Sequence, residues 1–127
     1  MNGEAVMELA RLIKSEEEMH AMRRSIFAAE RSIELMREHF KPGIEETRLW
    51  GYLHSEMIAR GGEWIETRLL AAGPRANPWY QECSSRPIEN GDLMSFDTDL
   101  VGAYGYCTDI SRSWLCGDKI PTDAQKD

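Results

Sequence analysis

Apolar residues recur at helical spacing through the first third of the chain. Residues 15–40 predict a long amphipathic helix because apolar side chains return every three or four positions: Met19, Met22, Ile26, Ala29, Ile33, Met36 and Phe40. Ser15 and Glu18 form a capping-box pair at its start, and Lys41-Pro42-Gly43 ends it. The apolar–polar stretch before it, residues 6–12, predicts a short helical lead-in.

A second amphipathic helix is predicted over residues 45–60. Leu49, Leu53 and Met57 make its apolar stripe, with Trp50 beside them, and Gly61-Gly62 is typical of a helix C-terminus. Residues 64–72 then predict a strand, and residues 82–86 predict a short one.

After the Asn90-Gly91 turn, the pattern changes to the alternation of a β-hairpin. Side chains two apart on a strand share a face, so Asp97 and Asp99 point the same way. A hairpin folded about Ala103 places Asp97 opposite Asp109 and Asp99 opposite Cys107. All three carboxylates then converge on one face, and the other face is apolar, with Phe96, Leu100 and Ile110.

Three convergent carboxylates repel each other, and each is costly to desolvate. The hairpin offers no Lys or Arg before Arg112. A divalent metal ion is the better counter-charge, because carboxylate oxygens suit hard and borderline cations. The alternative is a solvated acidic edge. Cys107 shares this face, and we interpret it as a small buried side chain or, alternatively, as a soft ligand. The three histidines, His20, His39 and His54, lack a ligand spacing and are interpreted as solvated or capping residues.

Composition narrows the class of protein. The 127 residues carry a net charge of −7, with a pI near 5.0, which argues against nucleic acid and against anionic membranes as partners. The sequence contains no run of apolar residues long enough to span a bilayer and no signal-peptide pattern. Three cysteines without paired spacing favour a reduced, cytoplasmic protein. We expect one domain over residues 1–127, of the α/β (α+β) class, with two helices packed on an antiparallel sheet and a loose tail over residues 118–127.

Longer motifs carry a resemblance to a known family. Residues 91–97 (GDLMSFD) and 105–113 (GYCTDISRS) resemble the metal-binding segment of the pita-bread enzymes, which include Xaa-Pro peptidases, prolidases, methionine aminopeptidases and creatinase. Residues 13–18, residues 41–46 and Gly61-Gly62 fit as well. The resemblance implies the first half of a catalytic domain built from two similar halves about a pseudo-two-fold axis.

Two departures distinguish this chain from the peptidases of that family. The peptidases place their first two metal-binding aspartates eleven residues apart, whereas Asp109 lies twelve residues after Asp97 and ten after Asp99. Trp79 stands where the peptidases carry a histidine. Both features resemble the dimethylsulfoniopropionate lyase branch, which forms dimethyl sulfide and acrylate. This resemblance implies Asp97, Asp99 and Asp109 as metal ligands for iron, manganese or zinc, with a dinuclear site as an option in the full-length enzyme.

The resemblance also implies what lies outside this chain: a histidine and two glutamates that complete the metal site, and the general base. We therefore expect little activity from the chain alone. For the parent protein, three hypotheses stand: a lyase acting on a small molecule, an Xaa-Pro peptidase acting on dipeptides, and a non-catalytic module. Trp79 and Tyr80 are candidates for a substrate wall, since aromatic faces attract a sulfonium cation; their alternative role is to cover the sheet. Because the second half of the fold is missing, we expect a homodimer.

Overall fold

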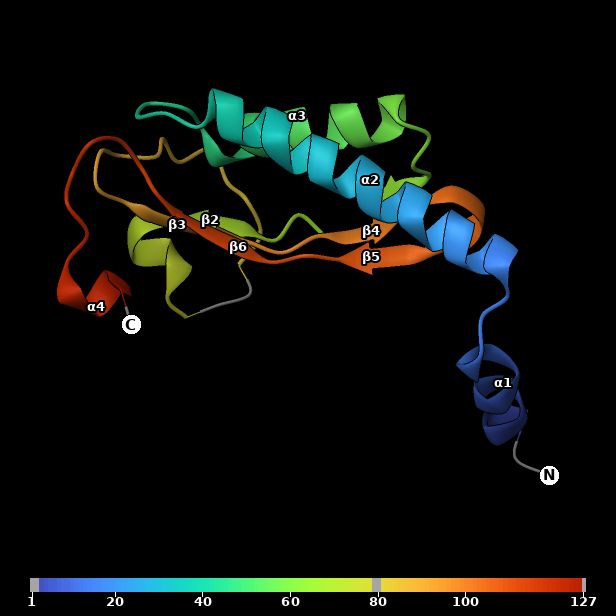
Figure 1. Cartoon of the computed structure of the whole chain (residues 1–127). Coiled ribbons are helices and arrows are strands. Elements are labelled where there is room, and N and C mark those ends of the chain that lie inside the picture. The colour runs from blue at the N-terminus through green and yellow to red at the C-terminus, as the bar shows by residue number, and fades with distance from the viewer. Residues whose placement is uncertain (1–2, 79–80, 127) are drawn as a thin grey trace.

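Two long helices lie on one face of an antiparallel sheet (Figure 1). The computed structural model describes residues 3–78 and 81–126. The helices are α2 (Glu16–His39) and α3 (Glu46–Ala59), with α1 (Gly3–Leu12) before them and α4 (Asp123–Lys126) at the end. The strands are β1 (Trp64–Ile65), β2 (Leu70–Ala72), β3 (Leu93–Phe96), β4 (Asp99–Val101), β5 (Cys107–Asp109) and β6 (Arg112–Leu115); two short 3-10 turns are η1 (Gly73–Ala76) and η2 (Ala103–Gly105). The predicted arrangement of two helices on an antiparallel sheet is confirmed.

Helix α2 begins as predicted but buries a different face. Ser15 accepts a hydrogen bond from the Glu18 amide, and the Glu18 carboxylate accepts one from the Ser15 amide, which completes the capping box. The N-terminal half of the expected apolar stripe is wrong: Met19 is 40% exposed and Ile26 is 42% exposed. The buried positions are mostly small: Ala21, Ser25, Ala28, Ala29, Ser32 and Met36.

Close approach to the sheet explains this choice of small residues. A Cβ atom added to Gly102 would lie 1.9 Å from the Ser25 hydroxyl oxygen and 3.0 Å from the Ser25 Cα. The helix backbone therefore runs almost against the strand end, where a methionine or isoleucine would not fit. The Tyr106 hydroxyl fixes the same end of the hairpin to α2 by donating to Glu18 Oε1 at 2.6 Å.

Helix α3 follows its prediction closely. Leu49, Leu53 and Met57 are buried in the core and Trp50 is buried beside them. The helix ends where Gly61 adopts a φ of +83° and the Gly62 amide donates to the Met57 carbonyl at 3.0 Å. This is the left-handed glycine C-cap that the Gly61-Gly62 pair predicts.

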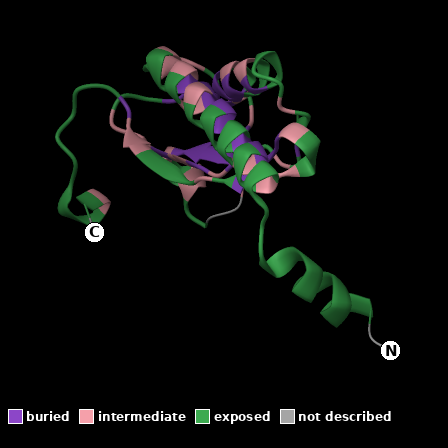
Figure 2. Cartoon of the chain, turned by 45° about the vertical axis from the view of Figure 1, so that its right-hand side comes forward, coloured by how far each residue is buried: buried purple, intermediate pink, exposed green. Residues whose placement is uncertain are grey.

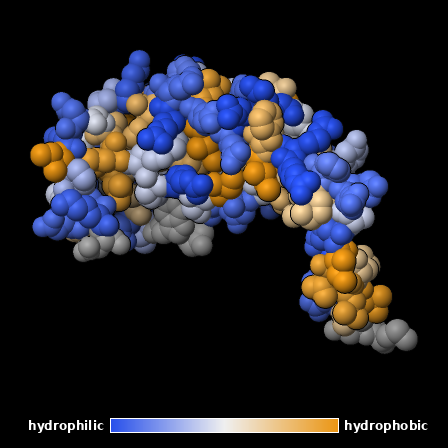
Figure 3. All heavy atoms as spheres, in the orientation of Figure 1, coloured by the Kyte–Doolittle hydropathy of each residue, from blue (hydrophilic) through white to orange (hydrophobic). Residues whose placement is uncertain are grey.

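Helix α1 projects away from the body of the protein. None of its residues is buried, and Figure 2 shows the whole helix as exposed. In the space-filling view of Figure 3, apolar atoms dominate its visible surface. The lead-in expected over residues 6–12 is thus a separate helix, whose exposed apolar side chains are Val6, Met7, Leu9 and Leu12.

The strand predicted over residues 64–72 is two strands in two sheets. The sheet orders are β1-β4-β5 and β2-β3-β6, and residues 66–69 connect the two. The short strand predicted over residues 82–86 is absent; the structure has only an isolated bridge between Leu69 and Glu82 there. The reason is a side chain: the Ser84 amide donates to the Glu46 carboxylate at 2.9 Å instead of to a neighbouring strand.

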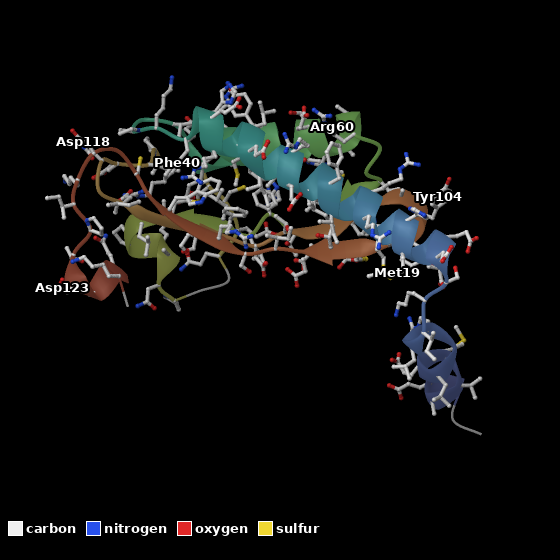
Figure 4. The ribbon with its side chains drawn as sticks, in the orientation of Figure 1. Met19, Phe40, Arg60, Tyr104, Asp118 and Asp123 are labelled. Carbon is white, nitrogen blue, oxygen red and sulfur yellow. The ribbon has the colours of Figure 1, made fainter. Side chains whose placement is uncertain are left out.

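The strand partners in the hairpin differ from the predicted ones by two residues. Asp99 lies opposite Asp109, and Val101 lies opposite Cys107. The turn is centred on Tyr104, which has a φ of +61° and is 80% exposed, and it is closed by a hydrogen bond from the Gly102 amide to the Tyr106 carbonyl at 3.0 Å. The centre therefore lies one residue after Ala103. Figure 4 shows Tyr104 at the tip of the hairpin, beside the N-terminal part of α2 that carries Met19.

The backbone pairing of β3–β4 with β5–β6 is interrupted once, and a buried side chain supplies the hydrogen bonds at the interruption. Thr98 is fully buried; its hydroxyl donates to the Ile110 carbonyl at 3.2 Å and accepts from the Ile110 amide at 3.0 Å. These two bonds replace one rung of backbone pairing between β3–β6 and β4–β5. The register of β3 with β6, in which Phe96 faces Arg112, continues unchanged into β4 and β5.

The predicted tail, residues 118–127, contains the short helix α4 (Figure 4). Two hydrogen bonds connect it to the turn before β3: Asn90 donates to Asp118 at 2.9 Å, and Gln125 donates to the Gly91 carbonyl at 3.3 Å. Within residues 3–78 and 81–126, no helix is both long enough and apolar enough to cross a membrane.

Candidate metal centre

The three aspartates singled out in the sequence lie on the sheet face that faces away from α2 and α3. Along β3 and β4, the partly exposed Asp97 and Asp99 alternate with the buried Phe96, Thr98 and Leu100. Asp99 is directly opposite Asp109, so these two share a face. Asp97, two residues before Asp99, is on the same face. The predicted common face is therefore present, although Asp109 is paired with Asp99 rather than with Asp97.

Hydroxyl and amide groups hold one oxygen of each of the first two aspartates. Asp97 Oδ1 accepts from the Ser111 hydroxyl at 2.7 Å and from the Thr98 amide at 3.1 Å. Asp99 Oδ2 accepts from the Thr67 hydroxyl at 2.7 Å. Each of these carboxylates keeps its second oxygen outside these bonds.

The neighbouring carboxylates change the protonation of the third aspartate. A hydrogen bond with Asp97 raises the pKa of Asp109, and burial and the negative charges of Asp97 and Asp99 raise it further. A carboxyl group retains its proton more strongly beside other carboxylates because each favours the neutral form of the next. The three groups therefore act as one electrostatic cluster.

The donor chemistry of this cluster fits a divalent cation, but the cluster is open. In the part of the chain that the structure describes, no group of three or more His, Cys, Asp or Glu side chains is close enough together to hold an ion. The described residues also include no Lys or Arg paired with these aspartates; Arg112 donates to the Ser111 carbonyl at 2.7 Å instead. The strand pairing thus brings the negative charges of the three aspartates onto one face, and no described cationic side chain pairs with them.

The remaining candidates have different outcomes. Trp79 and Tyr80 lie outside the described residues. The interpretation of Cys107 as a buried side chain is wrong, because it is exposed at the edge strand β5; all three cysteines are free. His39 stacks on Tyr52, with ring centroids 3.7 Å apart.

Sequence reasoning missed three residues that shape this region. Thr67 and Ser111 bind the aspartates, and the only sequence signal was the place of Ser111, two residues after Asp109. The third residue, Glu46 at the start of α3, is fully buried. It accepts from Arg75, from the Ala72 amide at 3.0 Å, and from the amide and hydroxyl of Ser84 at 2.9 and 2.7 Å.

Comparison with known proteins identifies the family. Residues 20–127 match the sequence model of metallopeptidase family M24. The chain belongs to this family. Among curated M24 relatives, it is 53% identical to the dimethylsulfoniopropionate lyase DddP of Roseovarius nubinhibens and 52% identical to that of Roseobacter denitrificans, in each case over 95% of this chain. An uncharacterised peptidase of Bacillus subtilis, YqhT, is 32% identical over the same share. The chain spans 28% of the length of each lyase.

Solved structures of other proteins have the same fold. The prolidase from Pyrococcus furiosus superposes with a TM-score of 0.86 at 24% identity, over 96% of this chain and 36% of its own. The Xaa-Pro dipeptidase from Bacillus anthracis gives a TM-score of 0.81 at 28% identity, over 94% of this chain and 33% of its own. The mixed helix and antiparallel-sheet fold of the pita-bread enzymes is therefore confirmed, over about a third of those proteins.

Proposed function

We propose that this chain supplies the aspartate part of the metal centre in a lyase that acts on dimethylsulfoniopropionate in the full-length protein. The observation that carries the metal proposal is the cluster of Asp97, Asp99 and Asp109 on one open sheet face, with a raised pKa at Asp109 and no cationic side chain paired with them in the described residues. The lyase assignment is supported by identities of 53% and 52% to two such lyases, against 32% to a peptidase.

The aspartates would hold iron, manganese or zinc, alone or as a pair of ions, because these metals accept carboxylate oxygens. A bound ion there would act as a Lewis acid on a bound substrate or on water. The part of this chain is to gather carboxylates and fix their direction.

The alternative is an Xaa-Pro peptidase. It is favoured by the family match and by the structural similarity to the Xaa-Pro dipeptidase of Bacillus anthracis. A module that keeps the fold without catalysis is the third hypothesis, and it predicts that the aspartates bind no ion.

Metal titration tests the site on the chain itself. We expect the wild-type chain to bind Mn²⁺ or Zn²⁺, and isothermal titration calorimetry measures the affinity. Asp97→Asn, Asp99→Asn and Asp109→Asn should each weaken binding by about tenfold or more, because each removes a charged ligand. Asp123→Asn, an exposed aspartate in α4, is the matched control and should leave binding unchanged. Equal binding by all five proteins would contradict the proposed site.

The substrate class needs the full-length protein. We expect it to release dimethyl sulfide from dimethylsulfoniopropionate, measured by gas chromatography, and to cleave Xaa-Pro dipeptides poorly. Rapid Xaa-Pro cleavage without dimethyl sulfide would favour the peptidase instead.

The proposal includes a cytoplasmic homodimer. Free cysteines support a reducing compartment. Strands β5 and β6 are sheet edges, and Phe27 and Ile58 are 51% and 47% exposed on the helices, so apolar and edge surface is available for a second copy. Light scattering coupled to gel filtration should give twice the mass of the chain. The mass of one chain at micromolar concentration would contradict the dimer.

A further inference from the structure

Two hydroxyl groups from separate segments point at the proposed metal ligands. Thr67 lies in the connection between β1 and β2, and Ser111 lies between β5 and β6, at the break in the hairpin. Thr67 donates to Asp99 and Ser111 donates to Asp97, both at 2.7 Å. Both contacts are short, as expected for hydrogen bonds to a charged acceptor.

These bonds select one orientation for each carboxylate. The terminal torsion of an aspartate has broad, two-fold minima, so an unrestrained carboxylate presents either oxygen. Here Oδ2 of Asp99 is engaged by Thr67 and Oδ1 of Asp97 by Ser111 and the Thr98 amide. The other oxygen of each side chain is the one outside these bonds. The hydroxyls thus decide which oxygen of each aspartate can be offered to a cation.

The fold does not need these hydroxyls to join the segments. The Glu66 amide already donates to the Asp99 carbonyl at 3.0 Å, and the Asp97 amide donates to the Leu69 carbonyl at 3.0 Å. The connection between β1 and β2 is therefore held to the hairpin by backbone bonds on both sides of Thr67. Near Ser111, the paired strands β3 and β6 do the same through Phe96 and Arg112.

We propose that Thr67 and Ser111 are positioning residues of the metal centre, which orient Asp99 and Asp97 for a divalent cation. This inference rests on the proposed function. Groups that hydrogen-bond to metal ligands fix the direction of the ligands, and their loss costs about 10- to 100-fold in metal affinity. Asp109 has no such hydroxyl donor among the described residues, so the positioning role concerns Asp97 and Asp99.

The sequence offers a matched control on the same face. The Ser113 and Ser95 hydroxyls are 2.7 Å apart, in the β3–β6 pair that lies two residues before Asp97 and two after Ser111, and no hydrogen bond joins either serine to an aspartate in the described residues. Ser113→Ala therefore removes a nearby hydroxyl, from β6, without touching a proposed ligand.

The test measures Mn²⁺ affinity of the chain by calorimetry, the electron paramagnetic resonance spectrum of bound Mn²⁺, and the thermal unfolding midpoint without metal. We expect Thr67→Val and Ser111→Ala each to weaken Mn²⁺ binding about tenfold or more and to alter the spectrum. Thr67→Ser and Ser111→Thr, which keep the hydroxyl, should retain the wild-type Mn²⁺ affinity and spectrum. Ser113→Ala should match the wild type in both.

The outcomes separate this inference from the proposed function. If Thr67→Val and Ser111→Ala bind Mn²⁺ as the wild type does, while Asp97→Asn and Asp99→Asn bind it weakly, the positioning role is wrong and the metal site stands. If the aspartate variants also bind like the wild type, both are wrong. If Thr67→Val or Ser111→Ala does not fold, the hydroxyl-retaining variants decide: weak binding by folded Thr67→Ser and Ser111→Thr also overturns the positioning role.

Discussion

Glu46 and the aspartate cluster are both carboxylate sites, and the protein treats them in opposite ways. Glu46 is fully buried and is surrounded by donors: the Arg75 guanidinium, the Ala72 amide, and the amide and hydroxyl of Ser84. Asp97 and Asp99 are partly exposed and accept only from uncharged groups, the hydroxyls of Ser111 and Thr67 and the Thr98 amide, and Asp109 is exposed. The first site is complete within the described chain, whereas the second gathers charge that the described chain does not neutralise.

The difference shows how a structural carboxylate is distinguished from a ligand. A buried charge is tolerated when donors satisfy it, and Glu46 thereby connects α3, β2 and the segment around Ser84. A charge cluster without a cation costs stability, and a protein retains it where a ligand compensates for the repulsion. Removing a carboxylate should therefore destabilise the first site and relieve the second.

The largest expected effect is the loss of Glu46. Glu46→Ala leaves the buried Ala72 amide and the part-buried Ser84 amide without an acceptor and removes the carboxylate that pairs with Arg75. We expect a loss on the order of 3 kcal/mol in the free energy of unfolding, measured by urea denaturation. Glu45→Ala is the control, because Glu45 makes no side-chain capping bond, and its effect should stay within about 0.5 kcal/mol. Similar stability of the two variants would mean that the Glu46 network contributes little.

A smaller effect is expected when one donor is removed. Ser84→Ala deletes the hydroxyl that donates to Glu46 Oε2 at 2.7 Å and keeps the Ser84 amide bond. We expect a loss of about 1.5 kcal/mol, the usual contribution of a hydrogen bond to a charged group. In the double variant with Glu46→Ala, the Ser84 substitution should add less than it costs alone, because only the bond that the Ser84 hydroxyl accepts from the Arg86 amide at 3.2 Å is left to lose. Full additivity in urea denaturation would show that the bond to Glu46 contributes nothing.

The smallest effect has the opposite sign and depends on pH. The pKa of Asp109 is raised in the folded protein above its ordinary value of 3.8. Such a group favours the folded state below its unfolded pKa, and this contribution is lost as the pH rises through its folded pKa. Asp109→Asn should therefore be more stable than the wild type near neutral pH.

Because Asp109 is exposed, solvent screening limits this gain to about 0.5 kcal/mol. The gain should shrink to zero below about pH 3.8, where the wild-type group is protonated in both states. Unfolding by urea across this pH range measures it, and a saturating divalent ion should reverse the order of the two proteins. A constant difference at every pH would mean that repulsion from Asp97 and Asp99 is not its cause.

Much of the fold could be predicted from local patterns. The capping box at Ser15, the glycine end of α3 and the stripe of Leu49, Leu53 and Met57 depend on neighbouring residues alone, and all three are confirmed. The shared face of Asp97 and Asp99 follows from strand geometry and is also present. These features need no knowledge of distant segments.

The errors arise where distant segments meet. The buried face of α2 depends on how closely Gly102 approaches Ser25. The spacing of apolar residues along the helix carries no information about this contact. The hairpin register depends on Tyr104 adopting a left-handed conformation that L side chains rarely adopt. The strand expected around Ser84 is lost to a side chain 38 positions earlier, Glu46. Each is a tertiary contact that overrides a local preference.

Helix α1 has a consequence for how the protein opens. It buries no residue, so its stability is that of an isolated helix of 10 residues, a length that is marginal in water. Its amides should exchange with deuterium nearly as fast as those of an unfolded peptide, while those of α2 exchange only through larger openings. The cooperative unit of this chain thus begins at the Ser15 cap, and a protease that cuts near Lys14 would remove α1 and leave the aspartate face intact.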